Sequence, residues 1–177
     1  MWTLSIDTGA HVAAALHCEG MLQDVFAQYK KGTAHESKEV KALARDITEW
    51  VEQYVPVEDV HVVVEAPSHR YFGRGNASAV LKTMWQVIRL ASFFNGRSRS
   101  ISMLPAPIWN KRRNDKQKRK VFMRKYPSHK EIPYYVDKHG SRSNDHERDA
   151  VLLGRWFYLN VVSKTDRSRI SEVTESA

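Results

Sequence analysis

Residues that can bind a metal ion or transfer a proton occur in three distant segments of the chain. Asp7 ends an alternating N-terminal run, and Glu65 directly follows the apolar run 60–64. His146 and Asp149 are three residues apart in a helical pattern, so they share one helix face. Carboxylates suit Mg²⁺ or Mn²⁺. Two such ions can bind both the attacking water and the leaving oxygen of a phosphodiester. The pattern predicts that these four residues are catalytic metal ligands.

Other interpretations of the same acids stay open at this point. A buried, unpaired acid costs several kcal/mol, which a metal would offset, but Glu65 alternatively caps a loop or pairs with Arg70. The acids Asp145, Glu147 and Asp149 alternatively complement the dipole of their helix. Asp145 and Glu147 are expected off the apolar stripe formed by Ala150, Leu153 and Phe157, whereas Asp149 is expected on it.

His146 is an unusual ligand for magnesium. Three roles are compatible with its position: a ligand of manganese, a ligand of one magnesium ion, or a group that orients the water or the leaving group. The sequence does not separate these roles.

The chain is strongly basic, with a formal charge of +8 and a pI near 9.6, which indicates a polyanionic partner. Between positions 111 and 125 the only acid is Asp115. The basic residues there are Lys111, Arg112, Arg113, Lys116, Lys118, Arg119, Lys120, Arg124 and Lys125. This segment predicts contacts to phosphates, with Lys111, Arg112, Lys116 and Lys118 as candidates. The alternatives are a solvated helix face or a run like a nuclear-localisation signal.

The segment 68–76, immediately after Glu65 and Ala66–Pro67, combines cations, aromatics and glycines. Exposed aromatics can stack on bases or wedge into a base step. We therefore predict that Arg70, Tyr71, Phe72 and Arg74 contact DNA. Alternatively, Tyr71 and Phe72 close the hydrophobic core.

The elements that must position these residues follow from periodicity and turn signals. Alternation and β-branched runs predict strands at 2–7, 11–18, 21–29, 60–64 and 100–104, with a two-residue turn at Glu19–Gly20. Apolar stripes predict helices at 36–55, 76–94, 116–126 and 144–162, the first two with caps at Thr33 and Asn76. The order βββαβαβαα predicts an α/β fold, a mixed five-stranded sheet flanked by helices. The strand at 60–64 is expected to be central and parallel.

The length of 177 residues suits one domain, predicted to span 1–162, with 163–177 as a disordered polar tail. Positions 128–142 are polar and turn-rich, without a clear period. Cys18 is the only cysteine, so a reducing compartment is expected. The first residues lack the pattern of a signal peptide, and no apolar run reaches about 20 residues. We expect an intracellular, cytoplasmic protein, in a bacterium or in the host cytoplasm of a virus.

The motifs together resemble those of RuvC-type Holliday-junction resolvases, within the RNase H-like nuclease superfamily. The resemblance covers roughly residues 2–160 and rests on segments 5–9, 62–65 and 146–150, together with Phe72 to Asn76, Ala106 to Lys111 and Lys118 to Val121. Some departures are present, since Thr8 replaces the commoner proline and the stretch between the two lysine segments is shortened and more charged. This divergence suits a viral or phage relative.

The resemblance implies an RNase H-like fold and a crossover junction endodeoxyribonuclease active in DNA recombination and repair. It implies a homodimer that nicks paired strands, with two Mg²⁺ ions per site, Mn²⁺ as a substitute, and 5′-phosphate and 3′-hydroxyl products. The residues implied to hold the four-way DNA junction are Arg70, Arg74, Lys111 and Lys118, with Phe72 opening the branch point. Helix 76–94 is the implied dimer element, through Met84, Trp85 and Ile88.

Three other functions compete with junction resolution. An RNase H-like nuclease with another substrate would cut other branched DNA or RNA–DNA hybrids. A non-catalytic junction-binding protein is disfavoured because all four ligand candidates are retained. The segment Ile6–Gly9 is also similar to the phosphate loop of actin-like sugar kinases, but those need two such domains around a nucleotide, and this chain is too short.

Overall fold

The computed structural model describes residues 1–9, 11–28, 37–67, 77–110, 135–136, 142–143 and 145–164. The strands of its main sheet are β1 (Trp2–Asp7), β2 (Val12–Cys18), β3 (Met21–Gln28), β4 (Val60–Ala66) and β5 (Ser100–Pro105). The helices are α1 (Ser37–Val51), α2 (Ala77–Phe94), α3 (Ala106–Asn110) and α5 (Asp145–Phe157), with a 3₁₀ turn at Val57–Asp59 and a π-helical segment at Tyr158–Val162. The strand order β3-β2-β1-β4-β5 confirms the predicted mixed five-stranded sheet.

The first three strands form an antiparallel meander with a tight turn between β2 and β3. Glu19 and Gly20 have φ angles of 51° and 73°, the pair of positive values that a type I′ hairpin turn needs. A Cβ at Gly20 would lie 2.5 Å from the Tyr158 ring, so glycine is required here for space as well. The hydroxyl of Tyr158 donates to Glu19 Oε2 at 2.6 Å, which ties the turn to the end of the last helix.

The central strand β4 pairs in parallel with β1 on one side and β5 on the other. Its valines at 60, 62, 63 and 64 are completely buried. A β-branched run suits a strand covered on both faces, so the predicted central parallel strand is confirmed.

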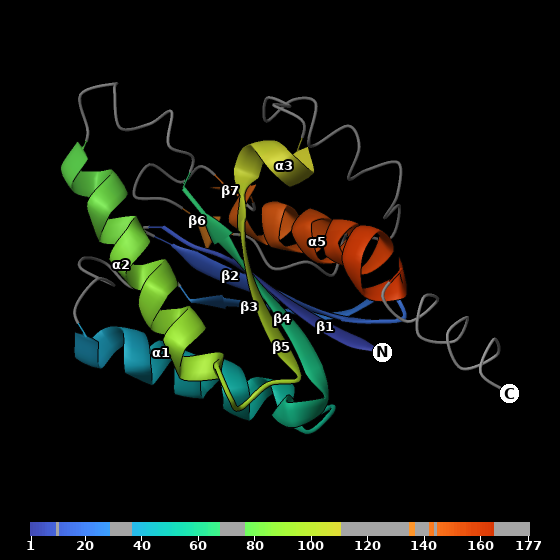
Figure 1. The fold of residues 1–177 in the computed structure, drawn as a ribbon. Helices are drawn as coiled ribbons and strands as arrows, with labels where there is room; N and C mark the ends of the chain where they lie inside the picture. Colours follow the sequence, from blue (N-terminus) through green and yellow to red (C-terminus); the bar gives the residue numbers. More distant parts are fainter. Residues whose placement is uncertain are drawn as a thin grey trace, which may run out of the picture.

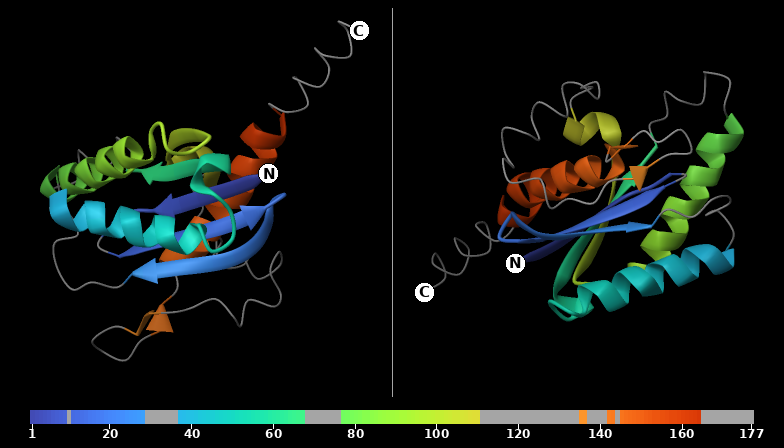
Figure 2. Two further views of the ribbon diagram at one scale, coloured as in Figure 1. Left: turned by 90° about the horizontal axis from the view of Figure 1, so that it is seen from below. Right: turned by 180° about the vertical axis from the view of Figure 1, so that it is seen from behind.

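Helices cover both faces of the sheet (Figures 1 and 2). On one face α1 and α2 pack over a core that includes Leu4, Ile6 and Val62. On the other face α5 and α3 pack over a second core that includes Ala13, Ala15 and Val63. Because side chains alternate along a strand, odd-numbered positions of β1 face α5 and even-numbered positions face α1 and α2.

Helix α5 lies unusually close to β1 and β2, because Gly154 faces them. A Cβ on Gly154 would lie 2.5 Å from Ser5 Oγ and 2.6 Å from the His17 ring. The Ser5 hydroxyl in turn donates to the Ala150 carbonyl of α5 at 2.7 Å. Burial, and then the charge of Arg155, lower the pKa of His17 to about 4, so this histidine is neutral inside the folded protein at physiological pH.

The structure differs from the sequence-based elements in four places. Helix α1 ends at Val51 instead of 55, where the chain turns toward Pro56. Helix α3 is not among the predicted helices, and its Pro107 lies in the first helical turn, where proline is tolerated. A short hairpin, β6 (Tyr135–Val136) with β7 (Arg142–Ser143), lies where no regular structure was expected. The last helix is π-helical from Tyr158 to Val162.

Several expectations fall outside the described residues: the caps at Thr33 and Asn76, the helix at 116–126, and most of the polar tail. Within the described residues, no helix is both long enough and apolar enough to cross a membrane.

The close contact at Gly154 predicts the effect of Gly154→Ala. Alanine favours a helix by about 1 kcal/mol over glycine, but the new methyl group would collide with Ser5 and His17. We expect a net loss of about 1–3 kcal/mol in the free energy of unfolding, measured by urea denaturation. The exposed Asn160→Ala control should change it by less than about 0.5 kcal/mol. A more stable Gly154→Ala variant would contradict the close packing.

Candidate active site

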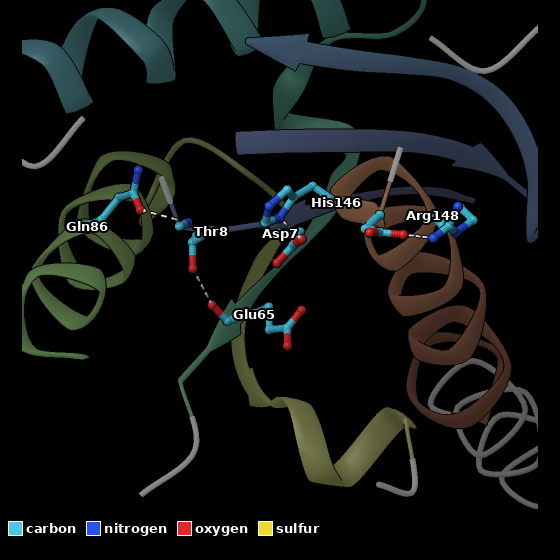
Figure 3. A network of polar contacts seen from close by, with 8 residues as sticks. Asp7, Thr8, Glu65, Gln86, His146 and Arg148 are labelled. Atoms are coloured by element: carbon cyan, nitrogen blue, oxygen red, sulfur yellow. Dashed lines mark hydrogen bonds and ion pairs between the residues drawn. The ribbon is translucent and has the colours of Figure 1, made fainter. Parts of the chain in front are cut away.

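Asp7 and His146 form a contact between the end of β1 and the first turn of α5. The Asp7 side chain is only 8% exposed, whereas that of His146 is 38% exposed. The Nδ1 atom of His146 lies 2.8 Å from Asp7 Oδ2 (Figure 3). A carboxylate can only accept, so Nδ1 carries the proton, and in the neutral ring Nε2 keeps its lone pair. The hydrogen bond to Asp7 thus fixes the orientation of the imidazole through Nδ1.

Glu65 lies at the same end of the sheet as Asp7. The last paired residues of the parallel strands β1 and β4 are Ile6 and Val64, and each acid is the next residue along its strand. Neighbouring strands are about 4.8 Å apart, and both acids are at positions that face α5. The Thr8 hydroxyl donates to the Glu65 carbonyl at 3.0 Å and ties the two strand ends together (Figure 3).

Asp149 is half-buried and lies three residues after His146 on α5. Asp145, at the start of the helix, is exposed and forms an ion pair with Arg148. Asp149 is thus less exposed than Asp145, in line with its expected place on the apolar stripe.

Glu147 corrects one expectation from the sequence. It was placed off the buried face of the helix, but it is only 1% exposed. The reason is that α5 is covered on more than one side, so Arg148 and Leu152 are buried along with the predicted stripe. Burial raises the pKa of the Glu147 carboxyl to about 7. A carboxyl group that is readily protonated near neutral pH thus follows His146 directly in the chain.

Gln86 of α2 was missed by the sequence analysis. Its side chain is completely buried, and its Oε1 accepts a hydrogen bond of 3.1 Å from the backbone nitrogen of Gly9 (Figure 3). The bond holds the turn that follows Asp7, so Gln86 positions that acid from the opposite helix layer. The only signal was a polar residue in step with Leu90 and Phe94, at a spacing of four.

His11 is a second residue that sequence reasoning missed. Its ring centroid lies 5.7 Å from that of His146. Burial, and then the charge of His146, lower the pKa of His11. The site therefore contains two neighbouring imidazoles, and a positive charge on one disfavours a charge on the other.

Carboxylate oxygens from two strand ends and from α5 are of the type that Mg²⁺ and Mn²⁺ accept, and an imidazole nitrogen suits Mn²⁺. Among the described residues, however, no three acidic, histidine or cysteine side chains form a group that could hold an ion. Asp7 is turned to His146 in this arrangement. The backbone brings the predicted ligands to one end of the fold, and their donor chemistry fits a divalent ion, while the side chains are not arranged around a common centre.

The eight predicted DNA-contacting residues lie outside the described residues. They are Arg70, Tyr71, Phe72, Arg74, Lys111, Arg112, Lys116 and Lys118. Their contacts to DNA therefore stay predictions.

Comparison with solved structures identifies two proteins of the same fold. RuvC of T. thermophilus, in complex with a Holliday junction substrate, is 15% identical, covers 93% of this chain and 97% of its own, and has a TM-score of 0.56. The yeast mitochondrial Holliday junction resolvase is 8% identical, covers 88% of this chain and 78% of its own, with a TM-score of 0.50. No family model and no curated protein sequence matches the chain. At these identities the likeness establishes the fold, and the predicted RNase H-like architecture is confirmed.

The Gln86 contact predicts that Gln86→Met lowers stability. The Gly9 N–H group would lose its acceptor, so we expect a loss of about 1–3 kcal/mol in the free energy of unfolding. Urea denaturation measures it. Lys82→Met, at an exposed position of the same helix, is the matched control and should be nearly neutral. Equal changes in the free energy of unfolding for the two substitutions would contradict the positioning role of Gln86.

Proposed function

We propose that this chain is a structure-selective endonuclease that resolves Holliday junctions by metal-dependent phosphodiester hydrolysis. The observation that carries the proposal is the Asp7–His146 pair beside Glu65, at the carboxyl end of the parallel strands β1 and β4. Two Holliday junction resolvases share the fold, and one is complexed with a junction. The net charge of +8 supports a nucleic-acid substrate.

In this proposal Asp7, Glu65, His146 and Asp149 hold Mg²⁺ or Mn²⁺, with two ions per site. Bound ions would supply an activated water and neutralise charge on the phosphodiester. Asp7 and Glu65 are donors from a rigid sheet, so their separation is fixed by strand pairing. His146, held through Nδ1, would present Nε2 either to a metal ion or to the attacking water, whose proton it could accept.

The remaining parts of the proposal concern DNA and organisation. The segments 70–74 and 111–118 hold the junction arms, and Phe72 opens the branch point. The nuclease domain spans 1–162 and acts in the cytoplasm, with 163–177 as a polar tail.

The proposed homodimer uses an exposed apolar stripe on α2. Leu81, Trp85 and Ile88 are 51%, 57% and 41% exposed and follow each other at spacings of four and three residues. A helix normally buries such a stripe, and a two-fold dimer matches the two equivalent strands of a four-way junction. Met84 is partly buried beside the stripe.

Removal of the central carboxylate tests the catalytic proposal. Asp7→Asn should slow Mg²⁺-dependent cutting of a synthetic four-way junction on the order of 10³-fold, while junction binding persists. Asp59→Asn, at an exposed position of the turn before β4, is the matched control and should cut like the parent.

The same assay, run beside flap, duplex and RNA–DNA hybrid substrates, separates the rival functions. Faster cutting of a hybrid or a flap would replace the junction as the substrate. Tight junction binding with no cutting of any substrate in Mg²⁺ or Mn²⁺ would indicate a binding protein. Full activity of Asp7→Asn would exclude this site.

The dimer proposal has its own measurement. Leu81→Glu should raise the dimer dissociation constant by about 30-fold or more in sedimentation, and should convert paired cuts into single nicks. The side chain is exposed, so the fold should be retained. Lys82→Glu, next to the stripe on the same helix, is the control. A parent protein that is monomeric on the junction would contradict the proposal.

A further inference from the structure

Helices α1 and α2 lie on the opposite face of the sheet from α5 (Figure 2). The residues of a basic pocket come from these two helices and from the turn after α2. The pocket is open to solvent and has a volume of about 320 Å³. Its lining residues are Lys41, Arg45, Arg89, Ser92, Phe93 and Arg97. Among the described residues, four cations and no acid line this pocket, so it is suited to a multiply charged anion.

The α1 side of the pocket places two cations where they repel each other. Lys41 and Arg45 are one helical turn apart and both exposed. Like charges at this spacing destabilise a helix unless something neutralises them. In the part of the chain that the structure describes, neither forms an ion pair with an acidic side chain. A bound anion would provide that neutralisation.

Both arginines on the α2 side of the pocket lie against an aromatic ring. The Arg97 guanidinium stacks on the Phe93 ring at 4.4 Å and donates to the Phe93 carbonyl. Arg89 lies 5.9 Å above the ring of Trp85. Guanidinium groups recognise phosphate through paired hydrogen bonds, and side chains held in advance lose less entropy on binding. Capping of the C-terminal end of α2 would explain the bond from Arg97 to the Phe93 carbonyl. It would not explain why Lys41 and Arg45 of α1 line the same pocket.

We propose that this α1–α2 pocket is a phosphate-binding site that holds the backbone of a junction arm away from the cutting centre. The phosphate chemistry stands on the pocket alone, whereas the junction arm as its source rests on the proposed function. Arg89 is only three residues from Gln86, about 4.5 Å along the helix axis, so α2 borders the turn after Asp7 and also this pocket. A DNA arm that leaves the cutting centre along α2 would meet the pocket next.

The test compares two variants that each lose two positive charges. Arg45→Gln/Arg97→Gln removes two pocket cations, and Lys38→Gln/Lys82→Gln removes two exposed cations that do not line the pocket. Binding of a four-way junction is measured without divalent metal, over a range of salt concentrations. We expect the pocket variant to bind at least about tenfold more weakly, with a salt slope smaller by about 1–2, and the control to change much less.

Equal junction affinities of the two variants would overturn the proposal. A calorimetric titration with inorganic phosphate separates the sources. Phosphate binding lost in the pocket variant, with unchanged junction binding, would contradict the junction arm and leave a free phosphate or nucleotide as the ligand. If the parent protein binds no junction at all, the proposed function fails. The phosphate titration alone then tests whether the pocket binds phosphate. Absence of phosphate binding, with capture of an acidic peptide instead, would also overturn the site.

Discussion

The close packing of α5 on β1 and β2 is the contact on which the candidate site depends. Gly154 lets the helix approach until Ser5 bonds to the Ala150 carbonyl. That approach fixes the first turn of α5 over the end of β1, where His146 meets Asp7. Strand pairing independently fixes Glu65 beside Asp7. The chemistry thus rests on one helix–sheet contact and one strand pair, both in the rigid part of the fold.

Helix α2 contributes residues to three different parts of the molecule: the turn after β1, the exposed apolar stripe and the basic pocket. Its buried side sends Gln86 to Gly9, next to the acid at the end of β1. Its exposed side carries the stripe that includes Trp85, and its C-terminal part lines the basic pocket with Arg89 and Phe93. One rigid element would therefore connect the position of a catalytic carboxylate, the contact with a second copy and the path of the DNA.

Much of the fold could be predicted because its signals are local. The turn at Glu19–Gly20 and the buried run of β4 each depend on a few neighbouring residues. The resemblance of short motifs added the architecture. Helix α3 was missed because it has only five residues and contains Pro107, which is tolerated in a helix only in the first turn. Glu147 was misplaced because a helical stripe assumes one covered side, whereas α5 is covered on several.

The sequence by itself determined which residues have the chemistry for a metal-dependent hydrolysis, Asp7, Glu65, His146 and Asp149, and which strands and helices carry them. Only the tertiary structure decided how these groups relate: that His146 anchors on Asp7, that Glu147 is buried, and that Gln86 reaches across from α2. The physical reason is range. Periodicity and turn geometry are set by residues a few positions apart, whereas the hydrogen bonds of the site join residues far apart in the chain: Gly9 and Gln86 are separated by 77 positions, and Asp7 and His146 by 139.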